Sequence, residues 1–156
     1  MNKKVIDALN EARSRELSAI LQYMAQHYEL DNDDFGKLAK TIKVTAIVEM
    51  KHAEKFGERI LFLGGVPTSK PDLDAKKGQD IAGMIATDIT LEEQAIDLYN
   101  SASALCAAEQ DMVSKQIFDE LVKEETDHLD EFQNIQEHVA KLGAAYLATL
   151  TGSAGD

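Results

Sequence analysis

The sequence has little of what shapes an irregular or covalently stabilised protein. Its 156 residues include one cysteine, two prolines, nine glycines and no tryptophan. The single cysteine, Cys106, excludes an internal disulfide and a four-thiolate metal site, and is typical of a reducing compartment. Because proline and glycine are scarce, few places force a helix to end. The composition therefore favours an all-α protein.

Long apolar runs and an excess of basic residues are also missing. No stretch approaches the roughly 20 apolar residues of a membrane-spanning helix, and Asp7 interrupts the start before a signal peptide can form. The 16 Lys and Arg against 28 Asp and Glu give a formal net charge of −12. Such a surface repels nucleic acid and anionic lipid, whereas it attracts cations. We therefore expect a cytoplasmic protein with no nucleic-acid or membrane partner.

The apolar residues follow a helical period along most of the chain. They recur every three or four positions and predict helices over about residues 4–30, 35–63, 80–107 and 112–142, with a short fifth at 144–150. Asp33 or Asp34 can cap the second helix, and the junction at 109–111 can cap the fourth. Residues 64–79 hold both prolines and form one long irregular connection. One domain over 1–156, built as a four-helix bundle with a long crossover between its second and third helices, is predicted.

Glutamate and histidine form a pattern that repeats along the chain. Two of the four histidines follow a glutamate by three residues, and another glutamate lies 33 residues before each pair. The set recurs at an offset of 76 residues, as Glu16, Glu49 and His52 and then as Glu92, Glu125 and His128. The same offset carries Tyr23 onto Tyr99. A repeat of this kind indicates an internal duplication of a site rather than a solvated charge pattern.

The spacing suits metal binding. Residues three apart on a helix project from the same face, so a carboxylate and an imidazole can reach one ion. A Glu from each of two helices with a Glu-x-x-His from each of the other two is the ligand set of di-metal carboxylate bundles. An oxygen-rich set suits iron or manganese, although zinc could also occupy it. We predict that these six residues bind two metal ions; a purely structural polar network is the alternative.

Two kinds of neighbour surround the predicted ligands. Asp88, one turn before Glu92, is either a hydrogen-bond acceptor for a ligand imidazole or a surface residue. Tyr23 and Tyr99 flank the site as packing residues or as electron donors.

A second apolar surface lies on the outer side of the predicted helix 35–63. At about 100° per residue, Met50 points roughly 130° away from the face that Glu49 and His52 define. Outer apolar stripes are formed by Ile47, Met50, Ala53, Gly57 and Leu61, and by Leu17, Leu21, Met24 and Tyr28. They predict a subunit interface. If the interface is two-fold, Met50 and its symmetry mate could ligate one haem iron; simple packing is the alternative.

Several segments resemble bacterioferritin, a ferritin-like family. They are Arg15–Glu16–Leu17 with Ala19, Gln22 and Tyr23, then Glu49–Glu54, Arg59–Leu63, and Val113–Gln116 leading to Glu125 and His128. The resemblance covers nearly the whole chain. It implies a ferritin-like bundle and a cage of twenty-four copies that oxidises ferrous iron with O2 or H2O2. The resulting ferric mineral is stored inside, for iron storage and detoxification.

The resemblance also implies roles for individual residues. Glu49 and Glu125 would bridge two irons in each subunit, while Glu16 and Glu92 would be terminal ligands. His52 and His128 would complete the two irons. One haem b would lie between two subunits with Met50 as its axial ligand, and a small electron-transfer protein such as a ferredoxin would support iron release.

Three positions depart from the family pattern. Val44 and Val48 stand where well-known members carry a His and an Asp that assist iron on the inner surface, and Gly64 replaces an acidic residue associated with a pore. These changes concern the route of iron and not the ligand set. Iron would pass through the di-iron site itself, or the cage would include a second subunit type.

Two other classes of protein fit parts of the pattern. A rubrerythrin-like di-iron peroxidase or oxygenase would use the same six ligands without a storage cage, although one cysteine excludes the form with a rubredoxin module. A helical assembly protein with no metal would carry its charges on the surface.

Overall fold

Four long helices and one short helix make up the computed structural model, which describes residues 2–153. They are α1 (Lys3–Asn32), α2 (Gly36–Phe62), α3 (Ile81–Ala108), α4 (Met112–Leu142) and α5 (Ala144–Ala148). No strand occurs in the described part of the chain. The predicted all-α four-helix bundle, with its long second connection and short fifth helix, is confirmed. None of the described helices is long and apolar enough to cross a membrane.

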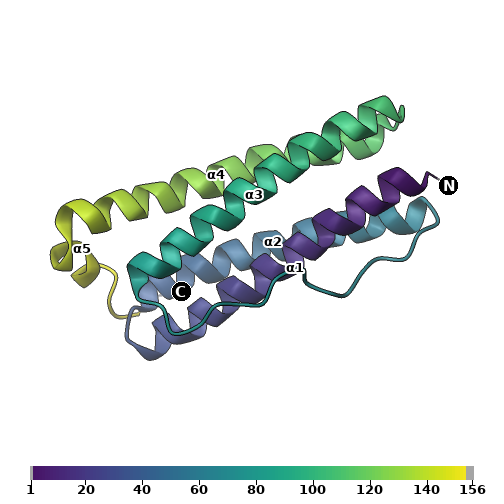
Figure 1. Cartoon of the computed structure of the whole chain (residues 1–156). Helices are drawn as coiled ribbons and strands as arrows, with labels where there is room; N and C mark the ends of the chain where they lie inside the picture. Colours follow the sequence, from purple (N-terminus) through teal and green to yellow (C-terminus); the bar gives the residue numbers. More distant parts are fainter. Residues whose placement is uncertain (1, 154–156) are drawn as a thin grey trace.

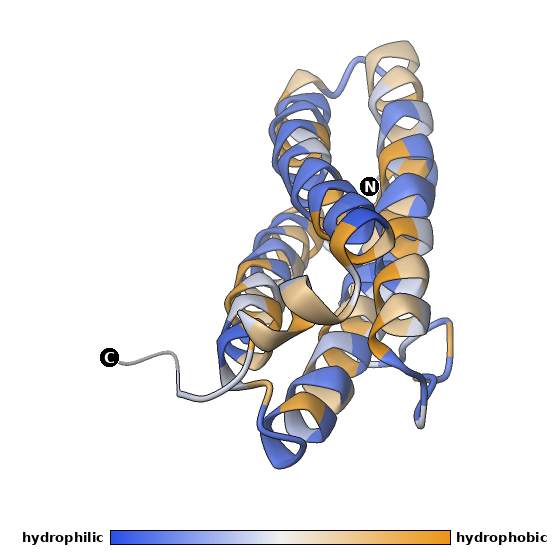
Figure 2. Cartoon of the chain, turned by 90° about the vertical axis from the view of Figure 1, so that its left-hand side faces the viewer, coloured by the Kyte–Doolittle hydropathy of each residue, from blue (hydrophilic) through white to orange (hydrophobic). Residues whose placement is uncertain are grey.

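The bundle consists of two antiparallel hairpins. Helix α1 packs mainly on α2, and α3 mainly on α4, while contacts between the hairpins are fewer. Figure 1 shows the two hairpins lying against each other, with α5 at the end of α4 far from the N-terminus. Polar and apolar residues alternate along every long helix (Figure 2). This alternation gives each helix one face for the core and one for solvent.

A polar layer divides the apolar core into two clusters. One cluster includes Leu30, Ile42, Ile85 and Phe132, and the other includes Leu9, Phe56, Tyr99 and Phe118. On each long helix, the switch from one cluster to the other occurs where a predicted metal ligand lies. The six ligands thus occupy the middle of the bundle, between two tightly packed apolar halves.

Among the four long helices, three begin with a local side-chain cap, and α2 is the exception. Asn2, Asp80 and Asp111 accept hydrogen bonds from the first turns of α1, α3 and α4, which satisfies backbone N–H groups that lack a helical partner. The junction at 109–111 therefore supplies the expected cap. Helix α4 ends at Gly143, whose φ of 52° suits glycine.

The predicted cap of α2 by Asp33 or Asp34 is wrong. Asp34 adopts a left-handed φ of 65°, which places Phe35 at the N-cap without a side-chain hydrogen bond. The C-terminal segment replaces the missing cap, since the Lys37 N–H donates to the Leu150 carbonyl oxygen at 3.3 Å. Gly36 allows this contact, because a Cβ there would lie 2.2 Å from the Gly152 carbonyl oxygen.

The long connection between α2 and α3 runs along α1 (Figure 1). A ladder of polar side chains four residues apart on α1 holds its backbone: Asn10, Ser14, Ser18 and Gln22. Gln22 makes two such bonds, accepting from the Lys76 N–H at 2.7 Å and donating to the Lys76 carbonyl oxygen at 2.9 Å. The connection thereby covers the outer side of the helix that carries Glu16.

Candidate metal centre

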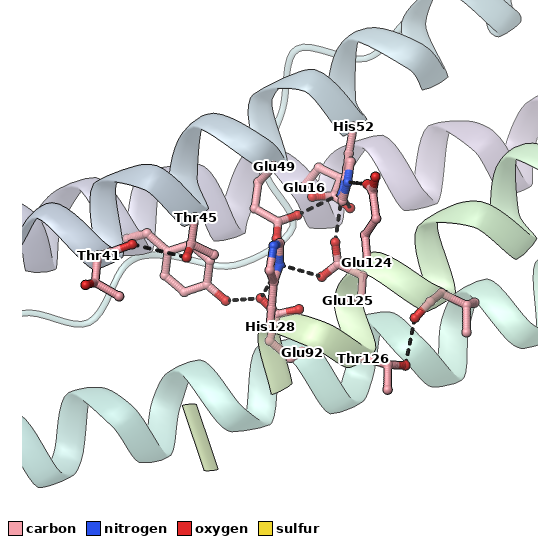
Figure 3. Close-up of polar contacts among 12 residues, drawn as sticks. Glu16, Thr41, Thr45, Glu49, His52, Glu92, Glu124, Glu125, Thr126 and His128 are labelled. Carbon is pink, nitrogen blue, oxygen red and sulfur yellow. Dashed lines mark hydrogen bonds and ion pairs between the residues drawn. The ribbon is translucent and has the colours of Figure 1, made fainter. Parts of the chain in front are cut away.

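The structure brings the six predicted ligands together at the centre of the bundle (Figure 3). Each of the four long helices contributes: Glu16 from α1, Glu49 and His52 from α2, Glu92 from α3, and Glu125 and His128 from α4. Five of the side chains are at most 2% exposed, and that of His128 is 12% exposed. Four carboxylates and two imidazoles therefore share one enclosed space.

In the first half of the cluster, His52 points its Nδ1 atom at three carboxylates. The distances are 2.8 Å to Glu125, 3.2 Å to Glu49 and 3.4 Å to Glu16. Its other ring nitrogen, Nε2, contacts Glu124. A metal ligand set can form on the Nδ1 side.

The second half mirrors the first. His128 Nδ1 lies 2.8 Å from Glu49, 3.6 Å from Glu92 and 3.9 Å from Glu125. The two imidazole rings are nearly parallel, with 6.3 Å between their centroids. Glu49 and Glu125 thus face both histidines, whereas Glu16 and Glu92 each face one.

The ligand atoms form two overlapping groups. One comprises Glu16, Glu49, His52 and Glu125, and the other comprises Glu49, Glu92, Glu125 and His128. Within each group the atoms lie within 4.8 Å of one another. The two groups share two carboxylates, and each also has an imidazole and a carboxylate of its own. This arrangement can accommodate two neighbouring ions.

Buried polar atoms without hydrogen bonds support metal binding on physical grounds. Within residues 2–153, these include both Oε atoms of Glu49, one Oε atom each of Glu16, Glu92 and Glu125, and the Nδ1 atoms of both histidines. Leaving one such atom unpaired costs about 1–3 kcal/mol, and more for a charged group. These seven atoms belong to the two ligand groups, so two cations would satisfy them together. Three further unpaired atoms lie outside the groups: Arg15 Nε, Gln26 Oε1 and Asp88 Oδ2. Oxygen-rich ligation with two imidazoles suits iron, manganese or zinc.

The same crowding perturbs the acids. Burial, followed by the charges of neighbouring carboxylates, raises the pKa of Glu49 and of Glu125 well above the usual value. Burial also raises the pKa of Glu92, but the proximity of Glu125 and of the His128 imidazole outweighs burial, so the net pKa is lowered. Burial lowers the pKa of His52, yet Glu125 and Glu16 reverse the effect and raise it to about 10. Without metal, protons take the place of cations in this cluster.

Two tyrosines hold the outer carboxylates. The Tyr23 hydroxyl donates to Glu92 Oε1 at 2.6 Å, and the Tyr99 hydroxyl donates to Glu16 Oε1. The hydroxyl of each tyrosine thus binds a predicted ligand that lies on the opposite hairpin. Burial, then the nearby carboxylates, raises the pKa of both phenols well above the usual value, which keeps them as donors.

Asp88 and Glu124 differ from what the sequence suggested. Asp88 is fully buried rather than a surface residue, and it accepts a 2.7 Å hydrogen bond from Gln26 Nε2 instead of one from an imidazole. Outside the six predicted ligands, the carboxylate that contacts a ligand imidazole is Glu124, at His52 Nε2, and sequence reasoning missed it. Its position immediately before Glu125 was visible, but the 76-residue repeat gives no signal there because the matching residue is Val48.

Met50 lies apart from this cluster, on the outer face of α2, and is 53% exposed. It borders a surface groove of about 410 Å³ between α1 and α2, together with Leu17, Ile20 and Leu61. Ala53 and Gly57, expected on the outer stripe, also line this groove, but they are buried. Arg13 covers them, since its guanidinium donates to the Ala53 carbonyl oxygen and lies 3.1 Å from where a Cβ of residue 57 would be.

Comparisons with known proteins agree with this architecture. The Ferritin-like domain model matches residues 6–142. Bacterioferritin of Desulfovibrio desulfuricans is 42% identical over 96% of this chain and 84% of the relative, and that of Brucella melitensis is 35% identical over 98% and 95%.

Solved structures show the same likeness. A D. desulfuricans bacterioferritin structure, described as showing its diiron site in different catalytic states, has a TM-score of 0.94 at 42% identity and covers 96% of this chain and 88% of its own. A Rhodobacter capsulatus bacterioferritin structure with a metal-free dinuclear site and a haem iron has a TM-score of 0.93 at 34% identity, covering 100% and 98%. From the family model, these identities and the shared bundle, the chain belongs to the bacterioferritin family of ferritin-like proteins.

Proposed function

We propose that this chain is the subunit of an iron-storage cage and oxidises ferrous iron at the six-residue cluster. The observation that carries the proposal is the pair of four-ligand groups that share Glu49 and Glu125. Related bacterioferritins support it, since one is described by its diiron site and another by a metal-free dinuclear site and, separately, a haem iron. Two ferrous ions held together would supply two electrons to O2 or H2O2, and the ferric product would join a stored mineral.

The residues of the chain position and neutralise the substrate ions. Four carboxylates against two divalent cations leave no net charge when all are ionised, so binding offsets the burial and the mutual repulsion that raise the pKa of Glu49 and Glu125. Tyr23 and Tyr99 fix the outer carboxylates in place. The two apolar clusters on either side keep bulk water away from the centre.

The outer groove is the part of the chain that would hold haem. Its lining by Leu17, Ile20 and Leu61 suits an apolar macrocycle, and the Met50 thioether is exposed beside it. Placed at a two-fold interface, Met50 of two subunits would hold one haem b between them, and this group would supply the electron-transfer chemistry for iron release. A small electron-transfer protein such as a ferredoxin would supply the electrons.

The outer faces of α1 and α2 also favour assembly with further copies. Leu21, Tyr28 and Ile47 are 50%, 65% and 39% exposed, so the single chain leaves a large apolar face in water. A homo-oligomeric cage built from two-fold dimers would bury it. In the cell, the protein would act in the cytoplasm.

The decisive test measures ferrous oxidation by stopped-flow absorption, comparing wild type with Glu125→Ala. Loss of one shared carboxylate removes a ligand from both ions, so we expect the rapid phase to fall by at least about 100-fold, the scale on which a lost positioning group acts. A matched control, Glu120→Ala, changes an exposed glutamate of the same helix and should oxidise iron as wild type does.

Size-exclusion chromatography of the same preparations, with iron content and visible absorption read across the peak, separates the alternatives. A large particle with iron and a haem Soret band supports the storage cage. A dimer with two irons per chain would instead indicate a rubrerythrin-like peroxidase or oxygenase. Rapid oxidation in Glu125→Ala would refute the proposed centre.

A further inference from the structure

The two histidines of the centre differ in what lies behind them. His52 faces the cluster with Nδ1, and its Nε2 atom contacts the carboxylate of Glu124, a residue of α4 that is 47% exposed (Figure 3). An imidazole that binds metal through Nδ1 must carry its proton on Nε2. A carboxylate placed there accepts that proton's hydrogen bond, fixes the tautomer and the ring orientation, and makes Nδ1 a stronger ligand.

The centre otherwise has an approximate two-fold symmetry that matches the 76-residue repeat. His52 Nδ1 lies 2.8 Å from Glu125, and His128 Nδ1 lies 2.8 Å from Glu49. Tyr23 donates to Glu92 just as Tyr99 donates to Glu16. The repeat therefore predicts, for every group around one ion, an equivalent group around the other.

Glu124 breaks this symmetry. The residue 76 positions before it is Val48, whose side chain has no atom that can accept a hydrogen bond. Within residues 2–153, the ion-pair contacts of His128 all involve Nδ1, and none involves its Nε2 atom. The His128 side chain is also 12% exposed, against 1% for His52. His52 is held on both sides of its ring, whereas His128 is held on one.

We propose that Glu124 is a positioning residue that makes the two metal positions unequal. The position formed with Glu16 and His52 binds a divalent ion first and more tightly, and the position formed with Glu92 and His128 binds the second ion more weakly. This inference rests on the proposed di-metal centre and adds an order of occupation to it. The weaker position is the one whose imidazole reaches the solvent.

Cobalt titration under non-turnover conditions tests the proposal without relying on activity. Co2+ absorption in the visible range reports each ion as it becomes coordinated. For wild type we expect two phases, one ion per chain in each. Glu124→Ala should weaken the first phase by about 10- to 100-fold, the effect usual for a lost partner of a ligand histidine. Glu124→Gln should restore most of the affinity, because its amide oxygen can still accept from Nε2.

Two further measurements make the test specific. Val48→Glu supplies the missing carboxylate to the other half and should tighten the second phase while leaving the first unchanged. Crystals grown with one equivalent of Co2+ should show anomalous density beside Glu16 and His52, and in Glu124→Ala that density should spread over both positions.

The outcomes separate this inference from the proposed function. If wild type binds no Co2+, the proposed centre fails and the inference with it. If wild type binds two ions with a single affinity, or if Glu124→Ala weakens both phases equally, the centre stands and the inequality of its positions is refuted.

Discussion

At the scale of residues, the centre is a balance of buried negative charge. Glu16, Glu49, Glu92 and Glu125 are each at most 2% exposed and converge in one space. Sequence spacing was enough to find them, because the offsets of 3 and 33 residues bring ligand types to one level of a bundle. Spacing could not find Glu124, whose role depends on the direction of an imidazole ring. Nor could it show that Asp88 is paired with Gln26, a contact between helices with no repeat.

One prediction follows from the raised pKa of Glu49. In the metal-free protein, burial and the charges of Glu16 and Glu92 make the ionised form of this carboxyl unfavourable. Glu49→Gln should therefore raise the free energy of unfolding of the metal-free protein by about 1–4 kcal/mol, the range seen when buried ion pairs are replaced by well-packed apolar residues of similar volume. Thermal unfolding in the presence of a chelator measures this effect.

The size of the stabilising effect of Glu49→Gln also depends on pH. A carboxyl with a raised folded pKa destabilises the folded state increasingly as pH rises above its unfolded value of about 4.3. The stabilising effect of Glu49→Gln should accordingly grow between about pH 5 and the raised pKa, and should be reversed when Fe2+ or Zn2+ is added. A variant less stable than wild type at neutral pH without metal would contradict this reading.

At the scale of elements, helix ends and connections show where sequence reasoning reached its limit. The cap by Asp111 was visible because it lies directly before an apolar period, whereas the start of α2 depends on a segment more than 100 residues away. The long connection was recognised as irregular from its prolines. Its path along α1 was not predicted, although Asn10, Ser14, Ser18 and Gln22 at intervals of four carry the signal.

A second prediction concerns the junction between the end of α2 and the start of α4. Arg59 Nη2 donates to Asp111 Oδ1 at 2.8 Å, and Arg59 Nε donates to Ser114 Oγ at 2.9 Å. Asp111 also accepts from the Ser114 N–H at 3.0 Å. Asp111→Ala removes the cap and the ion pair together, so a loss of about 1–2 kcal/mol of stability at pH 7 is expected by urea unfolding.

The stability lost in Asp111→Ala depends on pH because the Asp111 carboxylate is charged only above its pKa. Burial raises the pKa of Asp111, but hydrogen bonds from Ser114 and the Arg59 charge outweigh it, so the net pKa is lowered. The carboxylate therefore stabilises the fold above the usual aspartate pKa of about 3.9, and this contribution disappears as pH falls through the lowered value. Wild type and Asp111→Ala should converge in their unfolding midpoints at the acid end. An equal gap at pH 3 and pH 7 would show that the charge is not what stabilises the junction.

At the scale of the whole molecule, the single chain is incomplete on its outer side. The sequence predicted an apolar face on α1 and α2, and the structure leaves Leu21, Tyr28 and Met50 at least half exposed. What covers this face depends on the arrangement of further copies, which no helical period encodes. The fold of one chain could therefore be predicted from its sequence in more detail than its assembly.

A third prediction tests that surface. Leu21→Glu places a charge at the centre of the outer apolar face, where two-fold contact would bury it at a cost of several kcal/mol. We expect light scattering after size exclusion to show small species in place of a large particle, with helical content unchanged by circular dichroism. Thr90→Glu, which alters an exposed residue of α3 outside this face, serves as the matched control. Assembly of Leu21→Glu at the size of wild type would place the interface elsewhere.

The presence of two similar hairpins in one chain also has a consequence for evolution. A symmetric dimer of identical hairpins could build the same cluster, with each copy lending Glu49 or its equivalent to the other. Such a dimer would necessarily have two identical metal positions, since any mutation of the sequence changes both copies. Joining the hairpins in one chain through the connection over α1 removes that constraint. Val48 and Glu124 are free to differ only because they are encoded separately.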